Sequence, residues 1–270
     1  MATDKLRIEG IYTYPLKSGR PWSIQEGQLQ SSGLRHDRRF ALADPNGKFI
    51  SLRTCPQMVS LGCLHHAGQW QLTWEGAPGP SFAPKVEASS RTSIEVWGDV
   101  VDVAAASDQV NEWVSCRLGR PVTLVAYDDA SHRPVDPTYA PPGMTTMLAD
   151  GFPLLLTSTE SHAALDAWVG EPMEVGRMRP NLLVSGGAPF EEDSWVRLQG
   201  TEVSIELVKP CARCVATTVC PKTGHKGVEP LRSLAVHRKV NREVLFGQNA
   251  IVHQEGIVRV GEVLRIVSRR

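Results

Sequence analysis

The sequence has no excess of either charge. Its 270 residues include 29 Lys and Arg and 29 Asp and Glu, so the formal net charge is zero. A neutral chain exerts no overall attraction on nucleic acid or on an anionic membrane, so any basic site must be local. We therefore expect neither nucleic acid nor a membrane among its partners.

Long apolar runs and an export signal are also missing. Residues 1–10, MATDKLRIEG, lack the cationic stretch followed by an apolar segment that marks a signal peptide. No apolar run approaches the roughly 18 residues that a membrane-spanning helix requires. These absences predict a soluble cytoplasmic protein.

Several cofactor signatures are missing too. The sequence contains no internal repeat, no G-x-G-x-x-G or Walker A phosphate loop, and no motif for a flavin, a haem or an iron–sulfur cluster. The length fits one large domain or two small ones, and 41% of the residues are hydrophobic, enough to bury a core.

The first third of the sequence has the pattern of β-strands. Apolar and polar residues alternate in residues 6–15, 38–44, 68–75 and 91–106, and Asn46-Gly47 between two apolar runs indicates a hairpin. Residues 77–90, rich in Pro, Ser and Ala, are expected to form a loop or an insertion.

Helical spacing appears in three later segments. Val110, Trp113, Val114 and Leu118 predict a helix over 107–119, and residues 159–170 and 230–238 predict two more. Strands are expected at 121–127, 152–158, 179–187, 194–210, 214–220 and 249–270. Residues 128–151 form a long Pro-rich stretch, of the kind that is usually functional or disordered.

Many short strands with a few helices predict an α+β protein of mostly antiparallel sheets, with the strands arranged in barrels. The boundary between two lobes falls most naturally near residues 120–130. We place an N-terminal β-rich lobe at 1–125 and a C-terminal lobe at 126–270.

The six cysteines argue against a disulfide framework, which is typical of small secreted domains. Cys55, Cys63 and Cys116 have apolar neighbours in the sequence and are expected to be buried. The remaining three cluster in KPCARCVATTVCPKTG, residues 209–224.

The cluster allows several interpretations. Cys211, Cys214, Cys220 and His225 could bind zinc, although the second pair lacks compact zinc-site spacing. A redox C-x-x-C belongs at a strand-to-helix junction, whereas VATTV after Cys214 has the composition of a strand. Arg213 beside the thiols favours the thiolate form that binds soft metals. Spacing alone leaves a packed thiol pair as probable as all functional sites together.

The order of several motifs along the chain resembles the MOSC-domain proteins of molybdenum-cofactor metabolism, in particular the mitochondrial amidoxime-reducing component and bacterial YcbX-type reductases. The motifs are YPLKS (14–18), GLRHDRRFAL (33–42), PLLLTSTESHAALDAW (153–168), RMRPNLLVSG (177–186), EEDSW (191–195), PCARCVATTVCPKTG (210–224) and LFGQNAIVHQEGIVRVGEVL (245–264). The resemblance covers nearly the whole chain. It implies an N-terminal MOSC-type β-barrel domain followed by a C-terminal MOSC β-barrel.

The resemblance implies a molybdenum–pyranopterin cofactor with one protein thiolate on the metal, and that pattern falls on Cys214, with Cys211 as a neighbour that does not ligate. The family's cofactor-binding positions fall on Lys17, Ser18, Arg38, Ser158, Thr159, Arg179, Asn181 and Arg213. Arg and Lys suit a cofactor phosphate, and the expected helix start at Ser158 and Thr159 suits an anion. Arg38 and Arg39 would face opposite ways in a strand, with Arg38 toward the cofactor.

The resemblance also implies a reaction, the reduction of small N-hydroxylated compounds at the metal. His132 and Arg133 are candidates for the mouth of the site. Because no other redox motif is present, electrons are expected from a separate flavoprotein or ferredoxin-type donor.

A second hypothesis is a carrier or sulfur-transfer protein for the cofactor without turnover. The pyridoxal-phosphate domain of cofactor sulfurases does not fit in this length, so we do not expect sulfurase activity from this chain alone.

Overall fold

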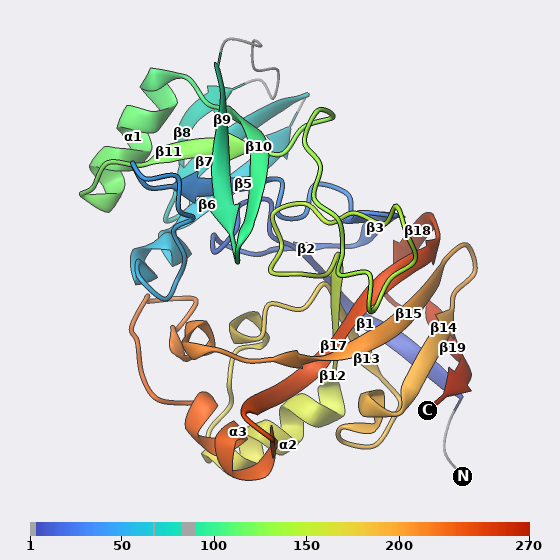
Figure 1. Cartoon of the computed structure of the whole chain (residues 1–270). Helices are drawn as coiled ribbons and strands as arrows, with labels where there is room; N and C mark the ends of the chain where they lie inside the picture. Colours follow the sequence, from blue (N-terminus) through green and yellow to red (C-terminus); the bar gives the residue numbers. More distant parts are fainter. Residues whose placement is uncertain (1–3, 67, 83–89) are drawn as a thin grey trace.

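The structure is a computed structural model that describes residues 4–66, 68–82 and 90–270. Figure 1 shows two β-rich lobes, with α1 (Asp108–Leu118) at the far side of one and α2 (Thr159–Val169) and α3 (Leu231–His237) at the far end of the other. The expected α+β class, mostly antiparallel β with a few helices, is confirmed.

A closed barrel forms the lobe that carries both termini (Figure 1). Its strands pair in the order β12 (Leu154–Ser158), β13 (Leu182–Ser185), β1 (Lys5–Thr13), β19 (Val263–Arg269), β14 (Trp195–Gln199), β15 (Ser204–Ala212) and β17 (Glu243–Gln254). β17 pairs with β12 again, which closes the barrel. Among these pairs, β12–β13 is parallel and the others are antiparallel.

The first strand illustrates how the sequence pattern forms this barrel. Leu6 and Ile8 of β1 are buried, and the alternating Lys5, Arg7 and Glu9 are exposed, as the two-residue period of a half-buried strand requires. β1 pairs with β13 and β19, which lie more than 170 residues later. Residues 5–13 are therefore part of a barrel whose other strands all follow residue 153.

Short strands extend this lobe. β2 (Trp22–Ile24) pairs with β1, and β16 (Lys239–Val240) pairs with β17. β3 (Glu26–Gln30), β4 (Gly33–Leu34) and β18 (Gly256–Arg259) form a small sheet. Leu29, Leu34 and Val258 from that sheet are buried in the core of the barrel.

The other lobe contains two sheets. One has the order β5 (Phe40–Ala43), β11 (Thr123–Ala126), β10 (Asp99–Ala105) and β9 (Arg91–Val96), and the other has the order β6 (Leu61–His66), β7 (Gln69–Trp74) and β8 (Ala77–Phe82). Phe40, Leu72 and Leu124 from these sheets share one core with Val110 and Val114 of α1.

All three helices lie where the spacing predicts them. Gly119 and Gly170 end α1 and α2 with φ of 64° and 88°, the left-handed conformation that glycine adopts without steric cost. No helix in the described part of the chain is long and apolar enough to cross a bilayer.

Three local predictions were wrong. Residues 77–82 form β8 rather than a loop, while residues 83–89 of the predicted loop lie outside the described residues. Val215–Thr218 form a 3₁₀ turn, η5, rather than a strand. Cys116 is exposed, whereas Cys55 and Cys63 are buried as expected.

The hydroxyls of Thr217 and Thr218 explain the turn at η5. They donate to the carbonyls of Cys214 and Val215, at 2.9 Å and 2.8 Å. Local side-chain bonds of this kind compete with strand pairing and here outweigh the β-propensity of Val and Thr.

Candidate functional site

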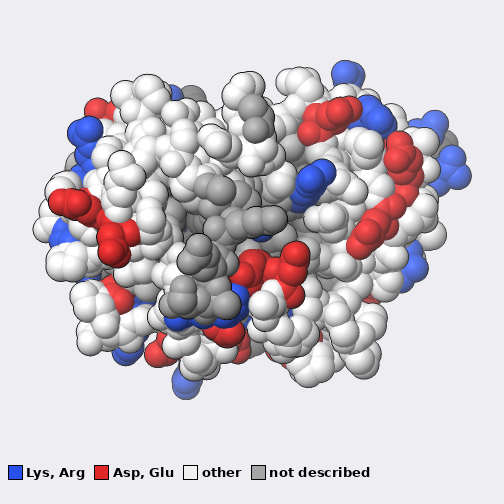
Figure 2. All heavy atoms as spheres, turned by 90° about the horizontal axis from the view of Figure 1, so that it is seen from above, with Lys and Arg blue, Asp and Glu red and all other residues white. Residues whose placement is uncertain are grey.

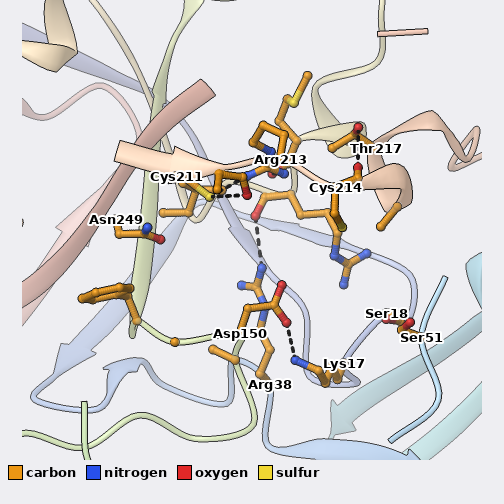
Figure 3. A pocket seen from close by; sticks show the side chains of 18 of the residues that line it. Lys17, Ser18, Arg38, Ser51, Asp150, Cys211, Arg213, Cys214, Thr217 and Asn249 are labelled. Atoms are coloured by element: carbon orange, nitrogen blue, oxygen red, sulfur yellow. Dashed lines mark hydrogen bonds and ion pairs between the residues drawn. The ribbon is translucent and has the colours of Figure 1, made fainter. Parts of the chain in front are cut away.

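A pocket of about 470 Å³ is lined by residues of both lobes. Figure 3 shows Cys211, Arg213 and Cys214 on one wall, with Lys17, Arg38 and Asp150 facing them. Seven of the nine predicted site residues line this pocket: Lys17, Ser18, Arg38, Arg179, Asn181, Arg213 and Cys214. These seven residues span 197 positions of the sequence, from Lys17 to Cys214, and converge on one cavity.

The pocket is strongly basic although the chain is neutral. The described residues that line it include seven cations, Lys17, Arg38, Arg53, Arg177, Arg179, Lys209 and Arg213, and one carboxylate, Asp150, a formal excess of six. On the face shown in Figure 2, by contrast, the described acidic and basic side chains are interspersed and neither sign forms a broad patch. The positive charge is thus concentrated in a cavity, which favours a small anionic ligand.

Four of the described lining residues have an unusual backbone. Ser18, Arg38, Trp97 and Arg179 have φ of 64°, 48°, 57° and 54°, in the left-handed region that residues other than glycine rarely adopt. Such conformations cluster at functional sites, where the surrounding structure stabilises them despite their energetic cost.

Arg38 lies in the turn between β4 and β5 and not in a strand. The prediction that Arg38 and Arg39 alternate in a strand was therefore wrong, although Arg38 does line the pocket.

Lys17 is a buried cation. Its ammonium donates to the carbonyl of Leu148 at 2.9 Å and to Oδ1 of Asp150 at 2.5 Å, and its side chain is only 5% exposed. Burial lowers the pKa of Lys17, and the carboxylate of Asp150 opposes this shift. The charge is kept in a fixed position by these two oxygen partners.

Arg38 and Arg179 lie together on Tyr14. Both guanidinium carbons are 4.2 Å from the centre of the Tyr14 ring, a cation–π arrangement. Nη2 of Arg38 donates to the carbonyl of Arg179, and Nη1 of Arg179 donates to that of Gly19. Burial, followed by the neighbouring charge of Arg38, lowers the pKa of Arg179 to about 10, so Arg179 remains cationic at neutral pH.

Two buried donors in the pocket lining are unpartnered. Nη2 of Arg179 and Nε of Arg213 make no hydrogen bond within the described part of the chain. Buried polar groups are almost always paired, and two unpaired cationic donors beside one cavity are compatible with an anionic ligand there.

The two cysteines of the C-x-x-C segment differ in their surroundings. Arg213 donates through Nη1 to the sulfur of Cys211 at 2.8 Å and through Nη2 to the carbonyl of Met178. The thiol of Cys214 lines the pocket, and no side chain or backbone group among the described residues is hydrogen-bonded to it. Cys214 is therefore the thiol that is available to a ligand.

Two sequence models match the chain, the MOSC N-terminal beta barrel domain over residues 5–121 and the MOSC domain over residues 144–265. The chain belongs to the MOSC-domain proteins. The predicted division at residue 125 falls between the two matched spans and stays a prediction.

Curated relatives of this MOSC chain have two different names. Mitochondrial amidoxime-reducing component 1 of Danio rerio is 28% identical, and the match covers 96% of this chain and 85% of the relative. Molybdenum cofactor sulfurase of Oryza sativa subsp. japonica is also 28% identical over 91% of this chain, but the match spans only 32% of that protein. Among solved structures, the YUAD protein from Bacillus subtilis aligns over 98% of this chain and 97% of its own, with a TM-score of 0.46 and 11% identity.

Ser158 and Thr159 of the MOSC chain are not part of the pocket lining. Ser158 is fully buried and caps α2 by accepting from the backbone N–H of Ser161 at 3.1 Å, and it donates to Glu192. The hydroxyl of Thr159 donates to Glu160. The helix start was correctly predicted, but the side chain at its N-cap is used within the fold.

Asn181 reaches the pocket but its amide holds the barrel together. Its Oδ1 accepts from the N–H of Leu155 at 3.1 Å, and its Nδ2 donates to the carbonyl of Tyr12 at 3.2 Å. These bonds tie the residue just before β13 to β12 and β1, so Asn181 positions the pocket wall.

The alternative zinc set is not assembled. No group of three or more Cys, His, Asp or Glu side chains among the described residues is placed to hold a metal ion. Cys220 does not line the pocket, and its sulfur lies 3.9 Å from a carboxylate oxygen of Glu174.

Arg133 has a different place from the one expected. It is 2% exposed and does not line the pocket. Its guanidinium donates to Asp99 and to the carbonyls of Met147, Ala149 and Asp150. Arg133 therefore holds the Pro-rich loop in shape, and His132 beside it is exposed to solvent.

Sequence reasoning missed several lining residues. Asp150 lies in the Pro-rich loop, and Arg53 and Trp97 come from segments that show no site pattern. Lys209 begins the cysteine-containing segment 209–224 but was not predicted as a site residue. Arg177 precedes Arg179 in the RMRP motif, and that motif was the one signal that could have identified it.

Proposed function

We propose that this pocket binds a molybdenum–pyranopterin cofactor and that the protein reduces N-hydroxylated compounds. The observation that carries the proposal is the combination of seven cations and one thiol without a hydrogen bond, Cys214, in a single cavity between the lobes. A cofactor with a phosphate and a metal needs these two kinds of group.

The residues present fit such a cofactor. Lys17, Arg38 and Arg179 supply charge for the phosphate and the polar head, and the unpaired Nη2 of Arg179 is a donor ready for an acceptor. Guanidinium groups favour bidentate phosphate contacts, and a buried lysine acts as a fixed point charge. Ser18, in its left-handed conformation, adds a hydroxyl to the same wall.

Cys214 is the proposed protein ligand of molybdenum. A thiolate is a soft donor that suits this metal. Cys214 has a free thiol and is the N-cap of the tight turn η5, where the N–H and the hydroxyl of Thr217 both donate to its carbonyl and fix the local backbone. Cys211 is held by Arg213 and is proposed to be a neighbour that does not bind the metal.

When bound, the cofactor would supply oxygen-atom removal from the substrate and storage of the electrons that this reaction consumes. The chain itself binds and orients: the buried Lys17 and the half-buried Arg179 would fix the anionic end of the cofactor. A separate flavoprotein or ferredoxin-type protein is the proposed electron donor, and the cytoplasm is the proposed location.

The reductase is preferred because the amidoxime-reducing relative matches this chain over 85% of its own length. A cofactor carrier or sulfur-transfer protein is the second candidate, supported by the sulfurase match, although this chain corresponds to only about a third of that relative.

Turnover separates the two candidates. Purified protein from a host that makes molybdenum cofactor should reduce benzamidoxime with dithionite-reduced viologen, but not with reduced nicotinamide alone. Adding a flavoprotein or ferredoxin-type reductase should restore activity with nicotinamide. Stoichiometric cofactor without any turnover would support the carrier.

A further inference from the structure

Asp150 is the one carboxylate among the described residues that line the basic pocket. Its Oδ1 accepts from Nζ of Lys17 at 2.5 Å and from Nε1 of Trp97 at 3.0 Å. No described group donates to Oδ2, and the side chain is 74% exposed. One oxygen is therefore fixed by the protein and the other is available to a ligand.

Trp97 is a large aromatic side chain that is 49% exposed at the same pocket. It has φ of 57°, in the turn between β9 and β10, and a left-handed conformation is strained for a bulky residue. The guanidinium carbon of Arg53 lies 4.1 Å from the Trp97 ring centre, and the Phe49 ring lies 5.6 Å away. The ring is thus held by several neighbours yet keeps half of its surface open.

Arg133 connects the segments that carry Trp97 and Asp150 and holds them in a fixed relative position. Its Nε donates to Asp99, two positions after Trp97, at 2.8 Å. Its Nη1 donates to the carbonyl of Met147 at 3.2 Å, and its Nη2 donates to that of Asp150 at 3.1 Å. The loop that carries the carboxylate is therefore tied to the hairpin that carries the aromatic ring, a preorganised arrangement.

The need to balance the charge of Lys17 does not by itself explain why a carboxylate, Asp150, lies in this basic pocket. A carboxylate weakens an anion site, and a pair with an exposed partner contributes little stability. Enclosure by the pocket raises the pKa of Asp150, but the Lys17 ammonium and the two hydrogen bonds outweigh it and hold the pKa below its ordinary value. Asp150 is therefore charged at neutral pH.

We propose that Asp150 and Trp97 form a subsite for a planar group with two nitrogen donors on one carbon, as in N-hydroxyamidines, N-hydroxyguanidines and their reduced products. The free carboxylate oxygen accepts N–H bonds from the group, and the indole covers one of its faces. The substrate class rests on the proposed reductase function. A pterin carries a similar donor pair, and the experiment must distinguish the two sources.

Binding of benzamidine, measured by calorimetry without metal turnover, tests the subsite directly. Benzylamine is the matched probe, a cation with a single nitrogen. Asp150→Asn should weaken benzamidine binding by about tenfold or more, because a charge-assisted bond is lost, and should weaken benzylamine binding less, because benzylamine has one nitrogen and no planar amidine group to lie against the indole. Trp97→Ala should weaken benzamidine binding more than Trp97→Phe, because Phe keeps a stacking surface. Asp129→Asn, an exposed carboxylate of the same loop, is the control and should change neither. Equal benzamidine affinity in Asp150→Asn and the parent protein overturns the subsite.

Kinetics then identify the ligand. In Asp150→Asn, KM for benzamidoxime should rise about tenfold with little change in kcat, whereas KM for benzhydroxamic acid, which lacks the amino donor, should stay constant. Molybdenum and pterin per chain should be unchanged, and loss of pterin instead would assign Asp150 to the cofactor and overturn the substrate assignment. If the parent protein reduces neither compound but binds benzamidine through Asp150, the reductase function fails and the subsite stands.

Discussion

Nη1 of Arg213 donates to the sulfur of Cys211 at 2.8 Å, and this bond distinguishes two cysteines that are only three positions apart. Cys211 has a cationic partner, whereas no described group is hydrogen-bonded to the sulfur of Cys214. The arginine between them occupies one thiol and leaves the other free to bind a ligand in the pocket.

This asymmetry predicts unequal effects of two matched substitutions. Cys214→Ser should abolish reductase turnover, by about a hundredfold or more, because an oxygen donor replaces the soft thiolate on the metal. Cys211→Ser should keep most of the turnover and of the Mo(V) resonance signal. Activity assays and electron paramagnetic resonance of the two variants provide the comparison, and equal losses would support a shared zinc or disulfide site instead.

Arg179 should control cofactor retention more than folding. Arg179→Ala removes a buried cationic donor, and a hydrogen bond to a charged group is worth about 1.5–3 kcal/mol. The parent residue already has a left-handed backbone, so the substitution adds no new backbone strain. Molybdenum per chain should fall while the thermal midpoint shifts by only a few degrees. An unchanged metal content in the purified variant would contradict the role of Arg179.

Arg133 should stabilise the Pro-rich loop and should take no part in the reaction. Arg133→Leu removes four side-chain hydrogen bonds and should lower the free energy of unfolding by about 1.5–3 kcal/mol. Urea denaturation measures this change, and His132→Ala, at the exposed neighbouring position, serves as the control. If His132→Ala lowered activity and Arg133→Leu left stability intact, our assignment of the two residues would be reversed.

His162 should make stability fall in mild acid. Burial, assisted by Arg213, lowers the pKa of His162 from 6.5 to about 4. Between these values the unfolded chain binds a proton that the native protein does not, so the native state loses stability as the pH falls. From pH 7 to pH 5 the loss from this group is on the order of 2 kcal/mol.

Urea denaturation at pH 7 and pH 5 tests that linkage. His162→Gln keeps a polar group near Thr157, the hydrogen-bond partner of His162, and should show a smaller loss between the two pH values than the parent protein. An equal loss in parent and variant would mean that other groups cause the acid sensitivity.

Local periodicity was sufficient to predict the three α-helices and most of the long strands, but not β8 or the turn η5. The helical spacing of Val110 and Val114 and the alternation around Leu6 and Ile8 both reflect burial of one face, and burial depends directly on residue type. The order of the motifs along the chain was sufficient to assign nine site residues, and seven of them line one pocket.

The remaining features depend on tertiary contacts that leave no periodic signal. The partners of Asp150, Lys17 and Trp97, lie 133 and 53 positions earlier in the sequence. The left-handed backbone of Arg38 and Arg179 is imposed by the surrounding structure against the preference of both residues. Ser158 was predicted at the site from a helix start, but a helix N-cap can face a ligand only where it borders a cavity, and here Ser158 lies outside the pocket lining and donates to Glu192.

Metal analysis of the protein from a host that makes molybdenum cofactor tests the central claim most directly. We predict close to one molybdenum and one pterin per chain in the parent protein, and sulfur ligation that decreases by one atom in Cys214→Ser but not in Cys211→Ser, as measured by X-ray absorption at the molybdenum edge. Zinc in place of molybdenum, or the same molybdenum–sulfur coordination in both variants, would contradict the account.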